Sequence, residues 1–273
     1  MARKLRIEYA GAMYHVINRG NHRSWIFETE GARRSFRLCL QEACGAMEWR
    51  LHAWVLMGNH YHLCLETPSP NLVEGMRWLQ STFANRFNRF RQTNGHVFQG
   101  RYKAMLLDGD AVGAVCHYIH LNPVRAGLIE AGKLEDYWES SFARLWRPRK
   151  REACEVPETA LLAAGGLADT PAGRRSYRDY LVWLSGEEGE RKRLGFEKMS
   201  RGWAKGWTGK WPWPAACANA TLPRTAGSPR TFTWVPRPMC KVWSVVTGPA
   251  MAAFTGRPSK NMKNWTDPFS SFP

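Results

Sequence analysis

The stretch that decides the fold is Met57-Gly58-Asn59-His60-Tyr61-His62-Leu63-Cys64-Leu65-Glu66. Gly58 and Asn59 have the composition of a tight hairpin turn, and the residues after them have the alternating pattern of a strand. Side chains alternate between the two faces of a strand, so we expect His60 and His62 on one face and Tyr61 on the other. The stretch therefore predicts a hairpin that holds two imidazoles side by side.

Hydrophobic periodicity on both sides of this hairpin predicts a split β-α-β unit. We expect strands over residues 12–18, 49–56 and 60–66, a fourth strand ending at 107, and helices over residues 28–47, 71–91 and 111–121. Pro123 is expected to end the last helix, because a proline disfavours helical backbone at the residue before it. This order is typical of an α+β, ferredoxin-like fold: an antiparallel sheet with helices packed on one face.

Charge is the most unusual feature of the composition. The chain has 273 residues, and Lys+Arg 39 against Asp+Glu 23 gives a formal net charge of +16. This excess indicates a polyanionic partner such as a nucleic acid, and the alternative is a basic surface kept only for solubility. No apolar run is long enough to predict a membrane span. Seven cysteines without a Cys-x-x-Cys pair argue against a disulfide framework and a thiolate zinc site, which indicates a reducing cytoplasm.

The sequence changes character after residue 146. We expect a domain over residues 1–146, a helical segment over 147–202, and a basic tail rich in Trp and Pro over 203–273. Ten of the sixteen prolines lie in this tail, so we expect this C-terminal extension to be irregular. Binding of nucleic acid and a non-native extension such as a frameshift product are both open interpretations of it. In the helical segment, an apolar stripe is formed by Tyr177, Tyr180, Leu181 and Leu184.

A second polar cluster lies on the helix expected over residues 111–121. Tyr118 and Asn122 are four residues apart and therefore lie on one helical face. The Asn122 carbonyl is a hard oxygen ligand suited to Mg²⁺ or Mn²⁺, and His60 and His62 are imidazole donors that accept Mn²⁺ and tolerate Mg²⁺. Such a site has room for phosphate oxygens and for attack by Tyr118 to form a covalent phosphotyrosine. Tyr61 is rejected as the nucleophile because strand alternation points it to the other face.

These residues also have structural interpretations. A His-x-His pair on a strand is more often a structural or zinc-like pair than a nuclease site. The alternative role for Asn122 is that of a cap for the following turn, with no part in metal binding. We interpret His15, on the first strand, as a core or edge histidine. His120 points elsewhere on its helix than Tyr118, so we interpret it as a satisfied structural residue.

Combined motifs give a resemblance to a known family. His60-Tyr61-His62 together with Tyr118-Ile119-His120-Leu121-Asn122-Pro123-Val124-Arg125 resembles the HUH single-tyrosine transposases of the IS200 type, and more closely the REP-associated tyrosine transposases of bacteria. Residues 14–21 and 99–103 also fit the family. The similarity covers residues 5–146, with a fainter continuation through 199–203. Tyr61 is aromatic where the family motif has an aliphatic residue, and Asn122 stands where insertion-sequence relatives have glutamine.

The resemblance implies a divalent metal and site-specific cleavage and rejoining of single-stranded DNA near palindromic hairpins, in the bacterial cytoplasm at the nucleoid. By position, His60 and His62 take the ligand roles and Tyr118 takes the nucleophile role. The oligomeric state, monomer or homodimer, is left open. The residues that we expect at the DNA, each of which can also be simple exposed surface, are Arg19, Asn21, Arg23, Arg101, Lys103 and Arg125.

Two rival functions remain. One is a domesticated DNA- or RNA-binding protein that keeps the fold and the charge without chemistry. The presence of both histidines and of Tyr118 argues against it. The other is a metal-dependent phosphoesterase in which water attacks, and it predicts a cleaved product without a covalent adduct.

Overall fold

An antiparallel sheet forms the centre of the part of the chain that the structure describes. The computed structural model describes residues 6–147 and 152–205. Its four strands are β1 (Ala12–Arg19), β2 (Arg50–Leu56), β3 (His60–Thr67) and β4 (Lys103–Leu107), in the order β2-β3-β1-β4 with antiparallel neighbours throughout. The α+β class and the split β-α-β sheet expected from the sequence are confirmed. The third strand is an inner strand, so its backbone is hydrogen-bonded on both sides.

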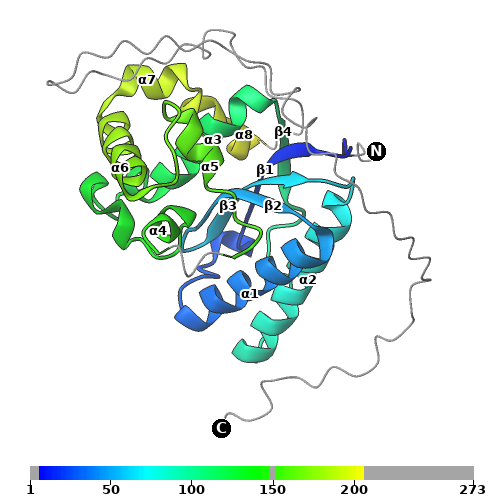
Figure 1. Cartoon of the computed structure of the whole chain (residues 1–273). Coiled ribbons are helices and arrows are strands. Elements are labelled where there is room, and N and C mark those ends of the chain that lie inside the picture. Colours follow the sequence, from blue (N-terminus) through cyan, green and yellow to red (C-terminus); the bar gives the residue numbers. More distant parts are fainter. Residues whose placement is uncertain (1–5, 148–151, 206–273) are drawn as a thin grey trace, which may run out of the picture. The chain divides into compact units, whose positions relative to one another are not determined.

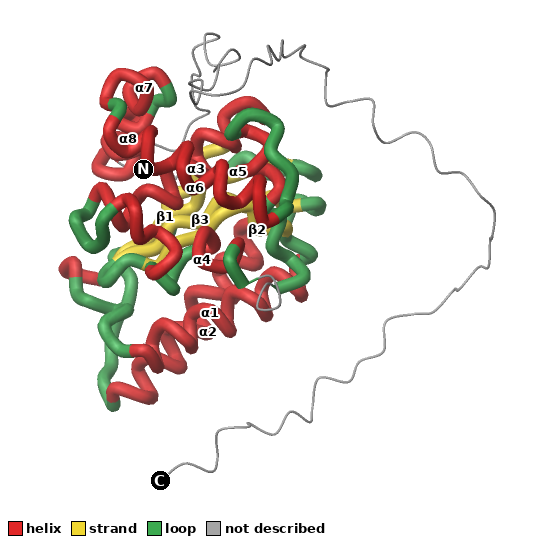
Figure 2. The backbone as a smooth tube through the Cα atoms, turned by 60° about the vertical axis from the view of Figure 1, so that its left-hand side comes forward, coloured by secondary structure: helices red, strands yellow, loops and turns green. Residues whose placement is uncertain are grey.

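One face of the sheet is covered by two helices, α1 (Glu30–Met47) and α2 (Leu72–Arg91), which run side by side in Figures 1 and 2. The Phe36 ring of α1 lies 4.8 Å from the Tyr61 ring of β3 and 5.2 Å from the Phe83 ring of α2. Thr29 caps α1 by accepting a hydrogen bond from the Ala32 N–H, as expected for a side-chain oxygen at this position. This face therefore has an aromatic core centred on the residue between the two histidines.

The opposite face carries α3 (Gly109–Arg125) and the C-terminal helices, as Figure 2 shows. The expectation of helices on one face is corrected here. Ile17 of β1 and Cys64 of β3 are fully buried against α3, while Val16 and Leu63 are fully buried on the side of α1 and α2. The inner strands thus carry buried side chains on both faces, and both faces need a cover of helices.

The end of α3 also differs from the expectation. The helix continues through Pro123 to Arg125, so the prediction that Pro123 ends it is wrong. A proline this late removes one backbone hydrogen bond, and the helix closes within the next turn. The Ala126 N–H donates to the Asn122 carbonyl at 2.9 Å, and Gly127 adopts a left-handed φ of 68°.

Shorter helices complete this side of the molecule. The apolar stripe expected at residues 177–184 is buried and belongs to the same core as α3.

The boundary expected at residue 146 stays a prediction. The tail expected over 203–273 lies outside the described residues, apart from 203–205, which continue the last helix. The remaining elements are η1 (Asn21–Arg23), η2 (Ala131–Asp136), α4 (Ser141–Leu145), α5 (Glu158–Ala163), α6 (Pro171–Gly186), α7 (Glu188–Arg193) and α8 (Phe196–Lys205). Within the described ranges, no helix has the length and apolar character needed to cross a membrane.

Buried polar groups join α3 to α4 and α6. The Tyr177 hydroxyl lies 3.0 Å from Nδ1 of His117 and 2.8 Å from Nδ1 of His120, and Nε2 of His120 lies 2.9 Å from the Ser141 hydroxyl. Burial lowers the pKa of each of these histidines to about 3, so both rings are neutral at pH 7. The interpretation of His120 as a satisfied structural residue agrees with these contacts.

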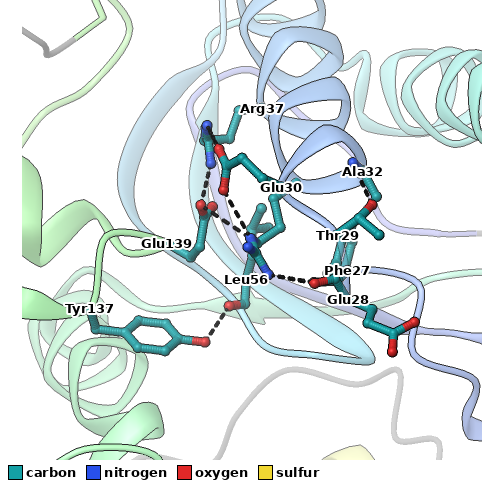
Figure 3. A network of polar contacts seen from close by, with 10 residues as sticks. Phe27, Glu28, Thr29, Glu30, Ala32, Arg37, Leu56, Tyr137 and Glu139 are labelled. Carbon is teal, nitrogen blue, oxygen red and sulfur yellow. Dashed lines mark hydrogen bonds and ion pairs between the residues drawn. The ribbon is translucent and has the colours of Figure 1, made fainter.

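A polar network holds the end of β2, just before the turn that leads into β3 and its histidine pair (Figure 3). The Tyr137 hydroxyl donates to the Leu56 carbonyl at 2.8 Å. Arg37 of α1 binds the Glu139 carboxylate and also lies 3.1 Å from the Glu30 carboxylate. The network therefore attaches the segment after α3 to β2 and to α1.

Candidate functional site

The β2–β3 hairpin places the histidine pair as the sequence predicts. His60 and His62 lie on the face covered by α3, and their ring centroids are 5.1 Å apart. Tyr61 lies on the other face, where it is fully buried and its hydroxyl accepts a hydrogen bond from Gln80 Nε2 at 2.9 Å. Tyr61 is therefore separated from the histidines by the sheet itself.

Helix α3 brings Tyr118 against this pair. The Tyr118 ring meets the His62 ring edge-on, with a centroid distance of 5.7 Å. The two residues are far apart in sequence, and they meet because α3 packs on the inner strands. The structure thus brings together the two motifs that the sequence carries separately.

His15 belongs to the same cluster, which the sequence did not indicate. It is fully buried, its Nε2 lies 3.0 Å from Nδ1 of His62, and the two rings are stacked at 5.3 Å. Its ring also lies 5.8 Å from the Tyr118 ring. In the sheet, His15 is paired with Cys64 and so faces the same side as His62. The ferredoxin-like strand order, which puts β1 beside β3, is the signal that points to this placement.

The surroundings of the histidines favour neutral rings. Burial lowers the pKa of His15 to about 3 and of His60 to about 4, and it holds the pKa of His62 well below the ordinary value. Nδ1 of His60 lies 2.7 Å from the Asn59 side-chain oxygen, which can only accept, so the proton is on Nδ1. A histidine protonated at Nδ1 presents its lone pair at Nε2, which is the form that binds metals.

The donor set fits a divalent ion of the kind that the resemblance implies. Among the described residues there is no group of three or more His, Cys, Asp and Glu side chains placed to hold a metal. The donors that the sequence predicts are the imidazoles of His60 and His62 and the amide of Asn122. Nδ2 of Asn122 donates to the Tyr118 backbone carbonyl at 3.1 Å, so the amide oxygen is the atom of this side chain that could bind a metal. A set of two nitrogens and one amide oxygen leaves coordination positions for phosphate oxygens.

Arg125, expected at the DNA, lies at the Tyr118 ring together with Phe196 and Ser200, which were not predicted from the sequence. Arg125 Cζ lies 4.8 Å from the ring centroid, and the Phe196 ring of α8 lies 5.4 Å away. The Tyr118 hydroxyl is 3.4 Å from Ser200 Oγ, which also accepts a hydrogen bond from Arg125 at 2.9 Å. Tyr118 is only 3 % exposed. The phenol is therefore enclosed by α8 and by the end of its own helix.

Positive charge flanks the histidine pair. Arg19 stands opposite His60 in the sheet. Burial is the largest cause of the lowered pKa of His60, and the charge of Arg19 is the second. The pKa of His62 is lowered mainly by burial, then by the neighbouring His60 and His15, and to a smaller extent by the charge of Arg125. Burial and Arg19 also lower the pKa of Lys103, which stands opposite Ile17 on β1. The site is thus electrostatically suited to an anion.

The other expected DNA-contact residues are placed less uniformly. Asn21 and Arg23 form part of η1, and the Asn59 side chain donates to the Arg23 carbonyl at 3.3 Å, so η1 lies beside the hairpin turn. Arg101 is exposed in the loop before β4. Asn59 thus connects η1 to His60, and Arg101 is an exposed basic residue.

Comparison with known proteins gives one family match and two similar solved structures. Residues 8–122 match the family model described as "Transposase IS200 like". A solved REP-associated tyrosine transposase bound to a REP hairpin is similar to the chain at 18% identity, covering 55% of this chain and 87% of that one, with a TM-score of 0.45. A protein of Deinococcus radiodurans R1 described as a candidate transposase is similar at 16% identity, covering 46% and 92%, with a TM-score of 0.32. No curated protein matches the sequence.

Proposed function

We propose that this protein cleaves and rejoins single-stranded DNA near palindromic hairpins through a covalent 5′-phosphotyrosine at Tyr118. The observation that carries the proposal is the convergence of Tyr118 with His60 and His62 inside the region that matches the IS200-like transposase family model. The hairpin in the proposal rests on the resemblance of the motifs to REP-associated transposases. The net charge of +16 supports a DNA partner.

Tyr118 has the chemistry of a nucleophile for transesterification. Its phenolic oxygen attacks the phosphorus and forms a bond to the 5′-phosphate, while the bond from phosphorus to the 3′-oxygen breaks. The phenol proton passes to the departing oxygen, which becomes a 3′-hydroxyl. Because one phosphodiester replaces another, a 3′-hydroxyl can reverse the step and rejoin DNA without ATP.

His60, His62 and the amide oxygen of Asn122 would hold Mg²⁺ or Mn²⁺. When bound, the ion supplies Lewis-acid stabilisation of charge on the phosphate oxygens. The protein's own contribution is to fix the tautomers of the two ligands. Asn59 holds the Nδ1 proton of His60, and His15 is placed to hold the Nδ1 proton of His62.

Arg19, Lys103 and Arg125 are assigned to the DNA backbone beside the scissile phosphate. Arg19, at the end of β1, stands opposite His60, Lys103, at the start of β4, stands opposite Ile17, and Arg125 lies over the Tyr118 ring. Since Tyr118 is 3 % exposed, DNA reaches its oxygen only after Phe196 and Ser200 of α8 have moved away. Binding of DNA and exposure of the nucleophile are therefore coupled in this proposal.

Denaturing electrophoresis tests the proposal and separates it from its rivals. Labelled, hairpin-bearing single-stranded DNA is incubated with the protein and Mn²⁺, for wild type and for Tyr118→Phe. A metal-dependent adduct in the wild type alone supports the tyrosine mechanism. Cleavage that persists in Tyr118→Phe supports hydrolysis by water. Tight binding without cleavage supports a domesticated binding protein, a candidate that the enclosure of Tyr118 also favours.

A further inference from the structure

An exposed tryptophan is held against the turn that begins the histidine strand. Trp25 is 63 % exposed although it is a large apolar side chain. A Cβ built on Gly58 would lie 2.3 Å from Cζ3 and 2.4 Å from Cε3 of the indole, so the six-membered ring rests on the Gly58 backbone. Gly58 stands two residues before His60. The indole can pack against the backbone at position 58 only because Gly58 has no side chain.

The segment that carries Trp25 is tied to the same turn at both ends. The Gly20 N–H donates to the Asn59 carbonyl at 2.8 Å, and the Phe27 N–H donates to the Gly58 carbonyl at 3.0 Å. Between them, the Arg23 carbonyl accepts from the Asn59 side chain at 3.3 Å. The indole is therefore positioned by the backbone of the turn that also positions His60.

Unusual backbone geometry precedes Trp25. His22 has a φ of 49° and Arg23 a φ of 59°, so two consecutive residues with side chains adopt the left-handed region. Both side chains are exposed. Such conformations persist only where the surroundings over-determine them, and they gather at ligand-binding positions. Here two exposed residues, one with an imidazole and one with a guanidinium, shortly precede the exposed indole in the chain.

We propose that Trp25 is a stacking platform for one unpaired nucleobase of the single-stranded DNA substrate, with Arg23 at the adjoining phosphate. The proposal rests on the proposed function and adds a base-binding subsite to it. An indole face with neighbouring cations is the arrangement that binds single strands without sequence preference. A protein partner would call for a continuous apolar patch, whereas Trp25 is a single exposed aromatic among polar and basic residues.

A base stacked on Trp25 would fix the register of the strand. The platform lies at the turn that leads into the two histidines, so the base is held near the phosphate that Tyr118 is proposed to attack. Backbone contacts alone allow a single strand to slide. A stacked base restricts this sliding and orients the phosphodiester.

The test measures affinity with a defined probe, because stacking is tolerant of sequence. Fluorescence anisotropy is recorded for full-length wild type, Trp25→Ala, Trp25→Phe and Trp138→Ala, with a labelled 20-mer of thymidylate and with an abasic deoxyribose-phosphate chain of the same length. Trp138 is the matched control: it is 54 % exposed, and Arg147 lies over its ring. Thermal unfolding of each variant shows that the fold is intact.

Trp25→Ala is expected to weaken binding of thymidylate by roughly 5- to 150-fold, the span that corresponds to one lost base–aromatic stack. Trp25→Phe and Trp138→Ala should stay close to wild type, and the Trp25→Ala deficit should vanish on the abasic chain. Equal binding of thymidylate by wild type and Trp25→Ala overturns the inference, as does a deficit of the same size on the abasic chain. Adduct formation by Tyr118 is a separate readout, so loss of the proposed cleavage activity leaves this result interpretable.

Discussion

Nε2 of His15 lies 3.0 Å from Nδ1 of His62, within a buried cluster that also contains the Tyr118 ring. One of these two nitrogens carries the shared proton. When the proton is on His62, the lone pair of that ring is at Nε2 and can bind a metal. When it is on His15, the His62 Nε2 carries a proton and cannot. Metal binding therefore selects the arrangement in which His15 is the acceptor.

This relationship predicts the effect of removing the acceptor. His15→Leu should weaken Mn²⁺ binding by about 10- to 100-fold, the usual cost of losing a partner that orients a metal-binding histidine. His15→Gln retains an acceptor oxygen and should lose less. Free Mn²⁺ is measured by electron paramagnetic resonance during titration of the protein.

The control is another buried histidine. His52 on β2 contacts the Thr159 hydroxyl at 2.7 Å and lies 3.6 Å from the Glu66 carboxylate, and His52→Gln should leave Mn²⁺ binding unchanged. An unaltered Mn²⁺ affinity in His15→Leu would show that His15 only fills space.

A second prediction concerns Arg125, which lies over the Tyr118 ring and donates to Ser200. If this guanidinium contacts a phosphate, Arg125→Gln should weaken single-strand binding and lower the salt dependence of log K by about one. Arg175→Gln, at an exposed position of α6, is the matched control. Affinities are measured by anisotropy at several NaCl concentrations. Parallel salt plots for wild type and Arg125→Gln would argue that Arg125 has no phosphate partner.

Local patterns in the sequence were sufficient to locate the two central motifs. Strand alternation placed His60 and His62 together, and helical spacing placed Tyr118 and Asn122 on one face. The strand order followed from the order of elements along the chain. These inferences hold because they depend on residues close in sequence and on a fold with a regular connection pattern.

The remainder of the site depends on contacts that no local pattern contains. His15 is 47 residues from His62, and Ser200 is 82 residues from Tyr118. Burial decides their roles, and burial is known only once α3 and α8 are in place. The expected helix end at Pro123 failed for a related reason, since packing of α3 against the sheet outweighs one lost hydrogen bond.

Acid sensitivity follows from the buried histidines. His15, His117 and His120 have pKa values of about 3 in the folded protein, below the ordinary value of 6.5. The unfolded state therefore binds more protons between these values, so the free energy of unfolding is highest above about pH 6.5 and falls as the pH is lowered towards 3. Each such histidine contributes a slope of up to about 1.4 kcal/mol per pH unit.

Urea unfolding at pH 7.5, 6.0 and 5.0 measures this slope. His120→Gln should make the curve less steep by about 1 kcal/mol per pH unit, since one buried histidine no longer titrates. His22→Asn, at an exposed position, should leave the slope as in the wild type. A wild-type stability that is flat over this range would contradict the neutral, buried state of these rings.

Glu139 tests the polar network of Figure 3. Its carboxylate binds Arg37 and lies 3.6 Å from Arg33, in a partly buried setting. Glu139→Gln should lower the free energy of unfolding by about 1–3 kcal/mol, because the partly buried Arg37 guanidinium loses its more buried carboxylate partner and keeps only the exposed Glu30. Mn²⁺ affinity should not change.

An exposed ion pair gives the comparison for Glu139. Glu130 lies 3.1 Å from Lys133, with both side chains largely exposed. Glu130→Gln should change stability by less than about 0.5 kcal/mol in the same urea titration. Equal effects of the two substitutions would mean that the Glu139 network adds no more stability than a surface pair.

The most direct test of the central claim is the covalent adduct itself. Wild type incubated with labelled hairpin-bearing single-stranded DNA and Mn²⁺ should give a protein–DNA band that survives denaturation, and mass spectrometry should place the phosphodiester on Tyr118. The band should be absent with Tyr118→Phe and after removal of the metal by EDTA. An adduct of equal yield in Tyr118→Phe, or cleavage by the wild type without any adduct, would contradict the assignment of Tyr118 as the nucleophile.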